Sequence, residues 1–111
     1  MPTLEFQGKQ IDVDEDGYLT NLDDWTEDLA KHLASQDEQE LTDAHWEVIN
    51  FLRNYYAQYQ IAPMIKILVK EIAKSMGPEK GNTKYLYQLF PDGPAKQACR
   101  YAGLPKPTGC V

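Results

Sequence analysis

Hydrophobic positions follow one spacing in the first twenty residues of the chain and another in the rest. Over residues 3–20, apolar side chains alternate with polar ones, and glycines suited to turns stand at positions 8 and 17. Alternation with a period of two is typical of strands that bury one face. We therefore predict a small antiparallel β-meander of short strands over residues 3–20.

From residue 21 onward, apolar residues recur every three or four positions, which predicts helices. Asn21 is a good N-cap for a first helix that ends before Gln36, with acidic residues in its first turns. Its apolar stripe would consist of Leu22, Trp25, Leu29 and Leu33. Thr42 caps a second helix that runs to about Tyr59, and its broad apolar face predicts a central position.

Prolines and glycines bound three further helices. A third helix starts near Pro63 and stops at Gly77-Pro78. Its predicted apolar stripe is Ile61, Ile65, Leu68, Ile72 and Met76. A fourth, shorter helix spans 84–89, and a proline-rich turn over 91–94 leads into a fifth. The fifth helix should end near Tyr101 or Ala102, where Gly103 suits a left-handed C-terminal cap.

These elements predict an α+β fold, mainly a helical array of about five helices with a small N-terminal antiparallel β-meander. With 111 residues and 42% hydrophobic content, the chain is long enough for one core. We expect a single domain over residues 1–102 and a flexible C-terminal arm over residues 103–111. Pro105 and Pro107 would make the start of this arm a semi-rigid spacer.

No apolar run approaches the roughly 20 residues that span a bilayer, and the N-terminus does not resemble a signal peptide. The sequence therefore predicts a soluble, cytoplasmic protein. A disulfide in that compartment would be transient and catalytic rather than structural.

The net charge of −6 conceals an asymmetry between the two halves of the chain. Residues 1–60 hold fourteen acidic and three basic residues, whereas residues 61–111 hold three acidic and eight basic ones. The basic half would attract an anionic substrate or the acidic rim of a partner. Alternatively, its lysines only solvate helix faces.

Both cysteines, Cys99 and Cys110, lie in the last thirteen residues. Zinc ligands usually come as closer pairs with further Cys or His in register, so we predict no metal site here. Seven residues beyond Gly103, at ~3.3 Å each, give the terminal thiol a reach of roughly 23 Å into a partner. The arm could also fold back into a disulfide, whose loop closure is worth roughly 3 kcal/mol. The alternative is a frayed tail with two incidental cysteines.

Two other motifs match functional templates. Residues 12–23 match the ligand spacing of a calcium loop, but the alternation before them indicates a strand, so we interpret them as an acidic hairpin turn. Lys66, Lys70 and Lys74 share one face of the third helix, and with the second helix it could form a DNA-binding helix-turn-helix. His32 and His45 lack metal-site spacing and are interpreted as structural or surface residues.

The C-terminal block GPAKQACRYAGLPKPTGCV, residues 93–111, closely resembles the C-terminus of the DsrC/TusE family. The resemblance extends along essentially the whole chain, including residues 17–19, 45–46, 50–56 and 84–91. It implies a sulfur-carrier protein that is a co-substrate of dissimilatory sulfite reductase (DsrAB) rather than a stand-alone enzyme. Cys110 would accept sulfur as a persulfide, and Cys99 would bridge to it in a trisulfide or resolve it as a disulfide.

The resemblance also implies partners. A sulfurtransferase complex of the DsrEFH or TusBCD type and a membrane-bound Dsr redox complex would act with the carrier, and Arg100 and Lys106 would guide docking or steady anionic sulfur. We expect no cofactor, because no residue set could hold sirohaem or an iron–sulfur cluster. The body of the chain is slightly more similar to the sulfur-oxidiser form. The alternative is a TusE-like relay for tRNA 2-thiouridine synthesis, which Cys99 disfavours because TusE members generally lack it.

Overall fold

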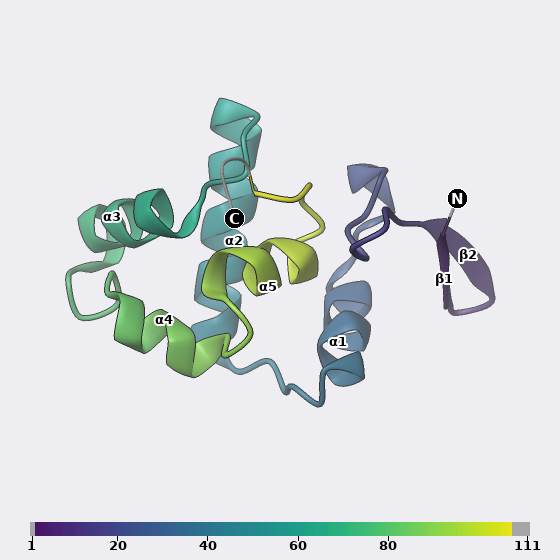
Figure 1. The fold of residues 1–111 in the computed structure, drawn as a ribbon, viewed down its shortest axis with the longest axis horizontal. Coiled ribbons are helices and arrows are strands. Elements are labelled where there is room, and N and C mark those ends of the chain that lie inside the picture. Colours follow the sequence, from purple (N-terminus) through teal and green to yellow (C-terminus); the bar gives the residue numbers. More distant parts are fainter. Residues whose placement is uncertain (1, 108–111) are drawn as a thin grey trace.

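A computed structural model describes residues 2–107 and confirms the α+β class, with five α-helices and a two-stranded antiparallel sheet at the N-terminus (Figure 1). The strands are β1 (Thr3–Phe6) and β2 (Lys9–Asp12), followed by a short 3-10 helix, η1 (Leu22–Asp24). The α-helices are α1 (Glu27–Gln36), α2 (Asp43–Tyr59), α3 (Ile65–Met76), α4 (Thr83–Leu89) and α5 (Pro94–Tyr101). Within the described residues, none of these helices is both long and apolar enough to cross a membrane.

The hairpin has the predicted strands in the register Thr3 to Asp12 and Phe6 to Lys9. The third predicted strand is reduced to a single bridge between Val13 and Leu19. Ladder pairing stops there because the chain enters η1 only three residues after that bridge. The predicted meander is therefore a hairpin with one bridging residue pair.

The first α-helix starts later than the sequence predicts. The Asn21 side chain accepts a hydrogen bond from the Asp23 amide and caps only η1, whereas Thr26 accepts from the Leu29 amide and caps α1. Trp25, between the two caps, has an extended backbone. Leu22 and Trp25 therefore do not belong to the stripe of α1, because Thr26 provides a second N-cap in front of the acidic turn.

The bounds of the other helices agree with the predictions to within two residues. Thr42 caps α2 in a capping box with His45, and Gly77 ends α3. Pro63 lies two residues before the start of α3, and Ile61 is 49% exposed rather than part of the apolar stripe. The chain between α2 and α3 thus remains non-helical for longer than the periodicity suggests.

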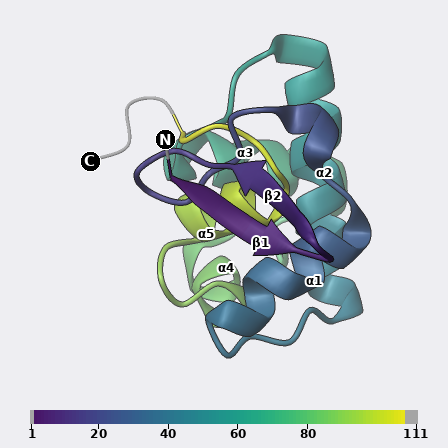
Figure 2. The same cartoon turned by 90° about the vertical axis from the view of Figure 1, so that its right-hand side faces the viewer.

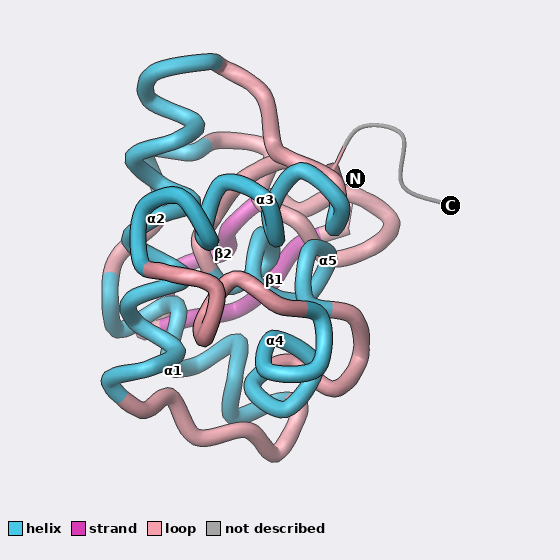
Figure 3. The backbone as a smooth tube through the Cα atoms, turned by 90° about the vertical axis from the view of Figure 1, so that its left-hand side faces the viewer, coloured by secondary structure: helices cyan, strands magenta, loops and turns pink. Residues whose placement is uncertain are grey.

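Helix α5 lies at the centre of the molecule. It packs against α1, α2, α3 and α4, and six of its eight residues are buried. In Figure 1 the helices α3 and α4 lie on one side of α5, and α1 and the hairpin lie on the other. Figure 2 views the molecule from the hairpin side, and Figure 3 from the side of α3 and α4. Alanines at positions 95 and 98 of α5 allow this close approach of neighbouring helices.

Candidate functional site

Cys99 lies in the last turn of α5, as predicted, and its side chain has no exposed surface. It belongs to the same hydrophobic cluster as Ala98, Tyr101 and Leu104. A reaction at the Cys99 sulfur therefore requires movement of the groups that cover it. Cys110 lies outside the described residues, and its role stays a prediction.

The end of α5 is closed by a left-handed cap centred on Gly103, as the sequence predicts. Gly103 has a φ of +73° and donates its amide hydrogen to the Arg100 carbonyl at 3.2 Å. The Leu104 amide reaches back to the Cys99 carbonyl at 3.0 Å, and the Leu104 side chain is buried. This pair of bonds is the Schellman motif, in which an apolar residue after the glycine packs on the last turn.

Two side chains from distant segments bind the next two carbonyl groups of the same turn. The indole Nε1 of Trp25 donates to the Tyr101 carbonyl at 2.7 Å, and Nη1 of Arg53 donates to the Ala102 carbonyl at 2.7 Å. The guanidinium carbon of Arg53 lies 3.7 Å from the centroid of the Trp25 ring. We call this pair of side chains the Trp25–Arg53 clamp.

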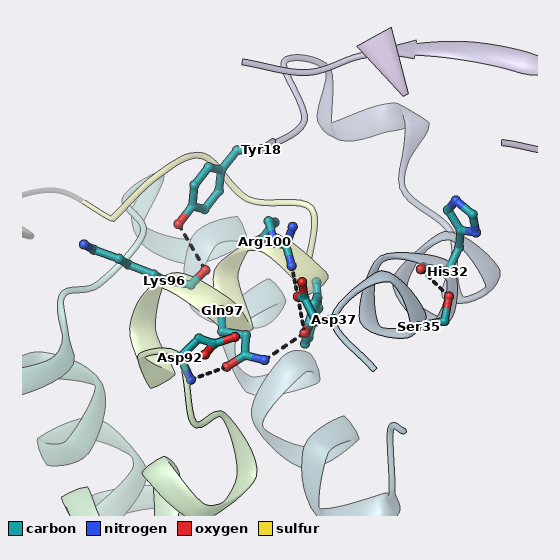
Figure 4. Close-up of polar contacts among 9 residues, drawn as sticks. Tyr18, His32, Ser35, Asp37, Asp92, Lys96, Gln97 and Arg100 are labelled. Carbon is teal, nitrogen blue, oxygen red and sulfur yellow. Dashed lines mark hydrogen bonds and ion pairs between the residues drawn. The ribbon is translucent and has the colours of Figure 1, made fainter. Parts of the chain in front are cut away.

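A polar network joins the other side of α5 to the end of α1 (Figure 4). Asp37, the C-cap of α1, forms an ion pair with Arg100 and accepts a hydrogen bond from the Tyr101 hydroxyl at 2.7 Å. The side-chain NH₂ group of Gln97 donates to the same hydroxyl at 2.8 Å, and the side-chain oxygen of Gln97 accepts from the backbone amide of Asp92. Burial raises the pKa of Tyr101, although the Gln97 hydrogen bond and the Arg100 charge act in the opposite direction.

Beside this network the surface is hollowed, with a volume of about 260 Å³. Its wall consists of Asp16, Tyr18, Asp37, Asp92, Lys96, Gln97, Arg100 and Lys106. Tyr18 donates its hydroxyl hydrogen to the Lys96 carbonyl at 3.2 Å, and Lys106 forms an ion pair with Asp16 at 2.9 Å. Helix α5 and the chain after it are thus tied to the loop that follows β2.

The hollow brings together Arg100 and Lys106, the two basic residues expected to contact a partner or an anionic sulfur group. Both are ion-paired within the molecule, and three carboxylates balance the three basic side chains of the wall. An incoming anion would therefore compete with Asp37 and Asp16 for these cations. A role in docking or sulfur binding stays a prediction for both residues.

No group of three metal-ligating side chains occurs within residues 2–107. In the segment that matches a calcium loop, one carboxylate oxygen of Asp14 accepts the amide hydrogens of Asp16 and Tyr18, both at 2.9 Å. That geometry agrees with the predicted acidic turn. His45 is buried and bonds to Thr42 and to the Leu89 carbonyl, which agrees with a structural role.

Sequence reasoning did not find Trp25, Arg53 or Asp37 as residues of this site. Composition offered one signal, because the chain has only two arginines among eleven basic residues. Both arginines meet the end of α5, Arg53 at a carbonyl group and Arg100 within the helix. The lysines of the predicted DNA-binding face, Lys66, Lys70 and Lys74, are exposed on α3, and that function stays a prediction.

Comparison with known proteins places this arrangement in a family. Residues 5–111 match the model of the family described as "DsrC like protein". The chain belongs to the DsrC-like family. A DsrC-like relative, "Sulfurtransferase TusE" of Photorhabdus laumondii subsp. laumondii, is 53% identical over 111 residues and over the full length of both chains.

Two solved structures of the DsrC-like family have the same fold. The NMR structure of Allochromatium vinosum DsrC is 63% identical, with a TM-score of 0.87 over 98% of this chain and 97% of that one. The crystal structure of the oxidized gamma-subunit of the dissimilatory sulfite reductase (DsrC) from Archaeoglobus fulgidus is 48% identical. Its TM-score is 0.83 over 99% of this chain and 100% of that one.

Proposed function

We propose that this protein is a sulfur carrier that accepts sulfane sulfur on Cys110 and delivers it to another protein. The main support is the similarity to a sulfurtransferase over all 111 residues, a span that includes the C-terminal block with Cys110. The hydrogen-bonded end of α5 also supports the carrier function, because it fixes the position from which the segment with Cys110 begins.

The loading step is thiol attack on a sulfur–sulfur bond. The Cys110 thiolate attacks the outer sulfur of a donor persulfide, R–S–SH. The sulfur–sulfur bond of the donor breaks, R–S⁻ leaves, and Cys110 becomes the persulfide Cys110–S–SH. No external oxidant is needed, because the Cys110 sulfur is oxidised while the inner sulfur of the donor is reduced to the thiolate R–S⁻.

Cys99 adds a second step to this cycle. The Cys99 thiolate can attack the inner sulfur of the Cys110 persulfide, form a Cys99–Cys110 disulfide and release HS⁻. Burial of Cys99 means that this step requires local opening around the last turn of α5. A carrier that only relays sulfur would not use this step.

The comparisons favour a TusE-like relay at least as well as a co-substrate of dissimilatory sulfite reductase. Relatives about half identical to this chain carry the name sulfurtransferase TusE, whereas similarity to DsrC structures and the presence of Cys99 favour the second reading. We therefore propose the relay as the basic activity. Use of Cys99 would be the property that extends it to dissimilatory sulfur metabolism.

Intact mass spectrometry after incubation with glutathione persulfide tests the carrier activity. Before any release of sulfide, the parent protein and Cys99→Ser should each gain the mass of one sulfur atom, and Cys110→Ser should gain none. Equal loading of Cys110→Ser and the parent would refute the proposal.

A second measurement distinguishes the relay from the two-cysteine cycle. The loaded parent and loaded Cys99→Ser are incubated without acceptor, and the released sulfide is measured. Release of sulfide from the parent alone would show that Cys99 takes part in the cycle. Equal, slow release from both proteins would show that the protein acts only as a relay.

A further inference from the structure

The end of α5 is held by more hydrogen bonds than its own cap supplies. The last carbonyl groups of a helix have no partner within the helix, and a Schellman cap provides for two of them. Here those two are the carbonyls of Cys99 and Arg100. The carbonyls of Tyr101 and Ala102 bond instead to the clamp, which comes from the segment before α1 and from α2.

The two members of the clamp support each other. A tryptophan has a single N–H donor, and an arginine presents its donors in a rigid plane, so each bond has a defined direction. The guanidinium carbon of Arg53 lies over the indole, 3.7 Å from the ring centroid, and this cation–π contact holds the two side chains together. The chain at Ala102 is therefore oriented by two rigid groups that are themselves in contact.

Gly103, the next residue of the chain, is also held in place by Trp25. A Cβ atom at position 103 would lie 2.5 Å from Cδ1 of Trp25, so the backbone passes directly over the indole. Trp25 thus contacts the chain at two nearby residues, through its N–H at Tyr101 and through its ring at Gly103.

The clamp gives the buried carbonyls of Tyr101 and Ala102 the partners that the Schellman motif does not supply. The clamp also sets the direction of the chain at the point between Cys99 and the segment that carries Cys110. We propose that Trp25 and Arg53 are positioning residues that set the direction in which the chain leaves α5 and so present Cys110 to a protein partner. This inference rests on the proposed carrier function.

Two kinds of sulfur donor should depend differently on the clamp. A small persulfide diffuses to Cys110 in any orientation, so its loading rate does not depend on the clamp. A donor protein must meet the terminal segment at a fixed site, so its KM depends on how the segment is presented. Loss of one clamp bond should raise the KM for a protein donor about tenfold with little change in kcat.

The test compares Trp25→Phe, which keeps a ring but lacks the N–H donor, with Arg53→Gln and the conservative Arg53→Lys. The chain offers matched controls in Trp46→Phe, the other tryptophan, which packs on the core from α2, and Lys80→Gln at an exposed ion pair. Each variant is loaded with glutathione persulfide and, separately, with a persulfidated sulfurtransferase of the TusBCD or DsrEFH type.

The expected result is normal loading of every variant by the small donor. With the protein donor, KM should rise for Trp25→Phe and Arg53→Gln, recover in part for Arg53→Lys, and stay at the parent value for both controls. An unchanged KM in both clamp variants overturns the positioning role. Failure of the carrier function is seen separately, as loading of Cys110→Ser.

A direct measurement covers the case in which a variant folds poorly. In a Cys99→Ala, Ser35→Cys protein, nitroxide labels on Cys110 and on the exposed position 35 of α1 report a distance distribution by electron paramagnetic resonance. Benzothienylalanine at position 25 replaces the indole N–H with a sulfur atom and so removes the donor while keeping a bicyclic ring. It should shift or broaden that distribution relative to tryptophan, and an identical distribution contradicts the proposal.

Discussion

Gly103 meets two separate requirements at the residue scale, a left-handed backbone and open space for the Trp25 ring. Gly103→Ala should cost about 1–2 kcal/mol for the backbone conformation and about 1–3 kcal/mol more for the overlap with the indole. Urea unfolding measures the loss. Gly8→Ala is the matched control, since Gly8 has a φ of +78° and, within residues 2–107, open space where a Cβ atom would lie. Equal losses in the two variants would show that Trp25 does not constrain this backbone.

Tyr101 joins α5 to α1 through its hydroxyl group. Tyr101→Phe leaves the Gln97 amide without its acceptor and removes one donor to Asp37, in a buried position. We expect a loss of about 1–3 kcal/mol in the free energy of unfolding at neutral pH. Tyr87→Phe, at an exposed ring on α4, should change stability by much less when both are measured in urea.

The same hydroxyl gives stability a dependence on alkaline pH. Because burial raises the pKa of Tyr101 in the folded protein, the unfolded chain releases this proton at a lower pH. The contribution is complete below the ordinary tyrosine pKa of about 10 and is lost as pH rises from there through the folded value. Stability of Tyr101→Phe should therefore fall less steeply than that of the parent above pH ~10. Parallel curves would contradict this assignment, since other groups titrate in both proteins.

At the scale of elements, the segment between η1 and α1 shows where sequence reasoning fails. Asn21 and Thr26 are both competent N-caps, and an apolar spacing that includes Trp25 favours the earlier start. The local sequence pattern cannot show that the Trp25 indole bonds to the Tyr101 carbonyl, 76 residues away, instead of packing in the apolar stripe of the helix. The Gly103 cap and the position of Cys99 could be predicted because they depend on neighbours in sequence. The clamp and Asp37 could not, because they depend on packing between distant segments.

The start of α1 can be tested by comparing its two candidate caps. Thr26→Ala should cost about 1 kcal/mol, because it removes the acceptor for the Leu29 amide, one of the free amides in the first turn of a ten-residue helix. Asn21→Ala should cost less, since η1 has only three residues. Thr26→Ser keeps the acceptor and serves as the control in thermal unfolding. A larger loss from Asn21→Ala would place the functional start of the helix at η1.

Across the whole molecule, the opposite charges of the two halves of the chain meet at specific contacts. Within residues 2–107 the ion pairs are Lys80 with Glu47, Arg100 with Asp37 and Lys106 with Asp16. Each joins a base from the second half to an acid from the first. The asymmetry that predicts attraction of anions thus also serves to hold α5 and the following residues to the N-terminal half. A partner with an acidic rim would have to compete with these internal carboxylates.

These pairs should differ in strength and in response to salt. Asp37→Asn leaves the charge of Arg100, whose side chain is 21% exposed, without its carboxylate, and we expect a loss of about 1–3 kcal/mol. Asp16→Asn acts on a pair about half exposed, worth at most about 1 kcal/mol. Because exposed pairs are screened more than partly buried ones, the loss from Asp16→Asn should vanish in high salt while that from Asp37→Asn persists. Urea unfolding at low and high sodium chloride measures both, and equal salt sensitivity would mean that the Arg100 pair is as solvated as the Lys106 pair.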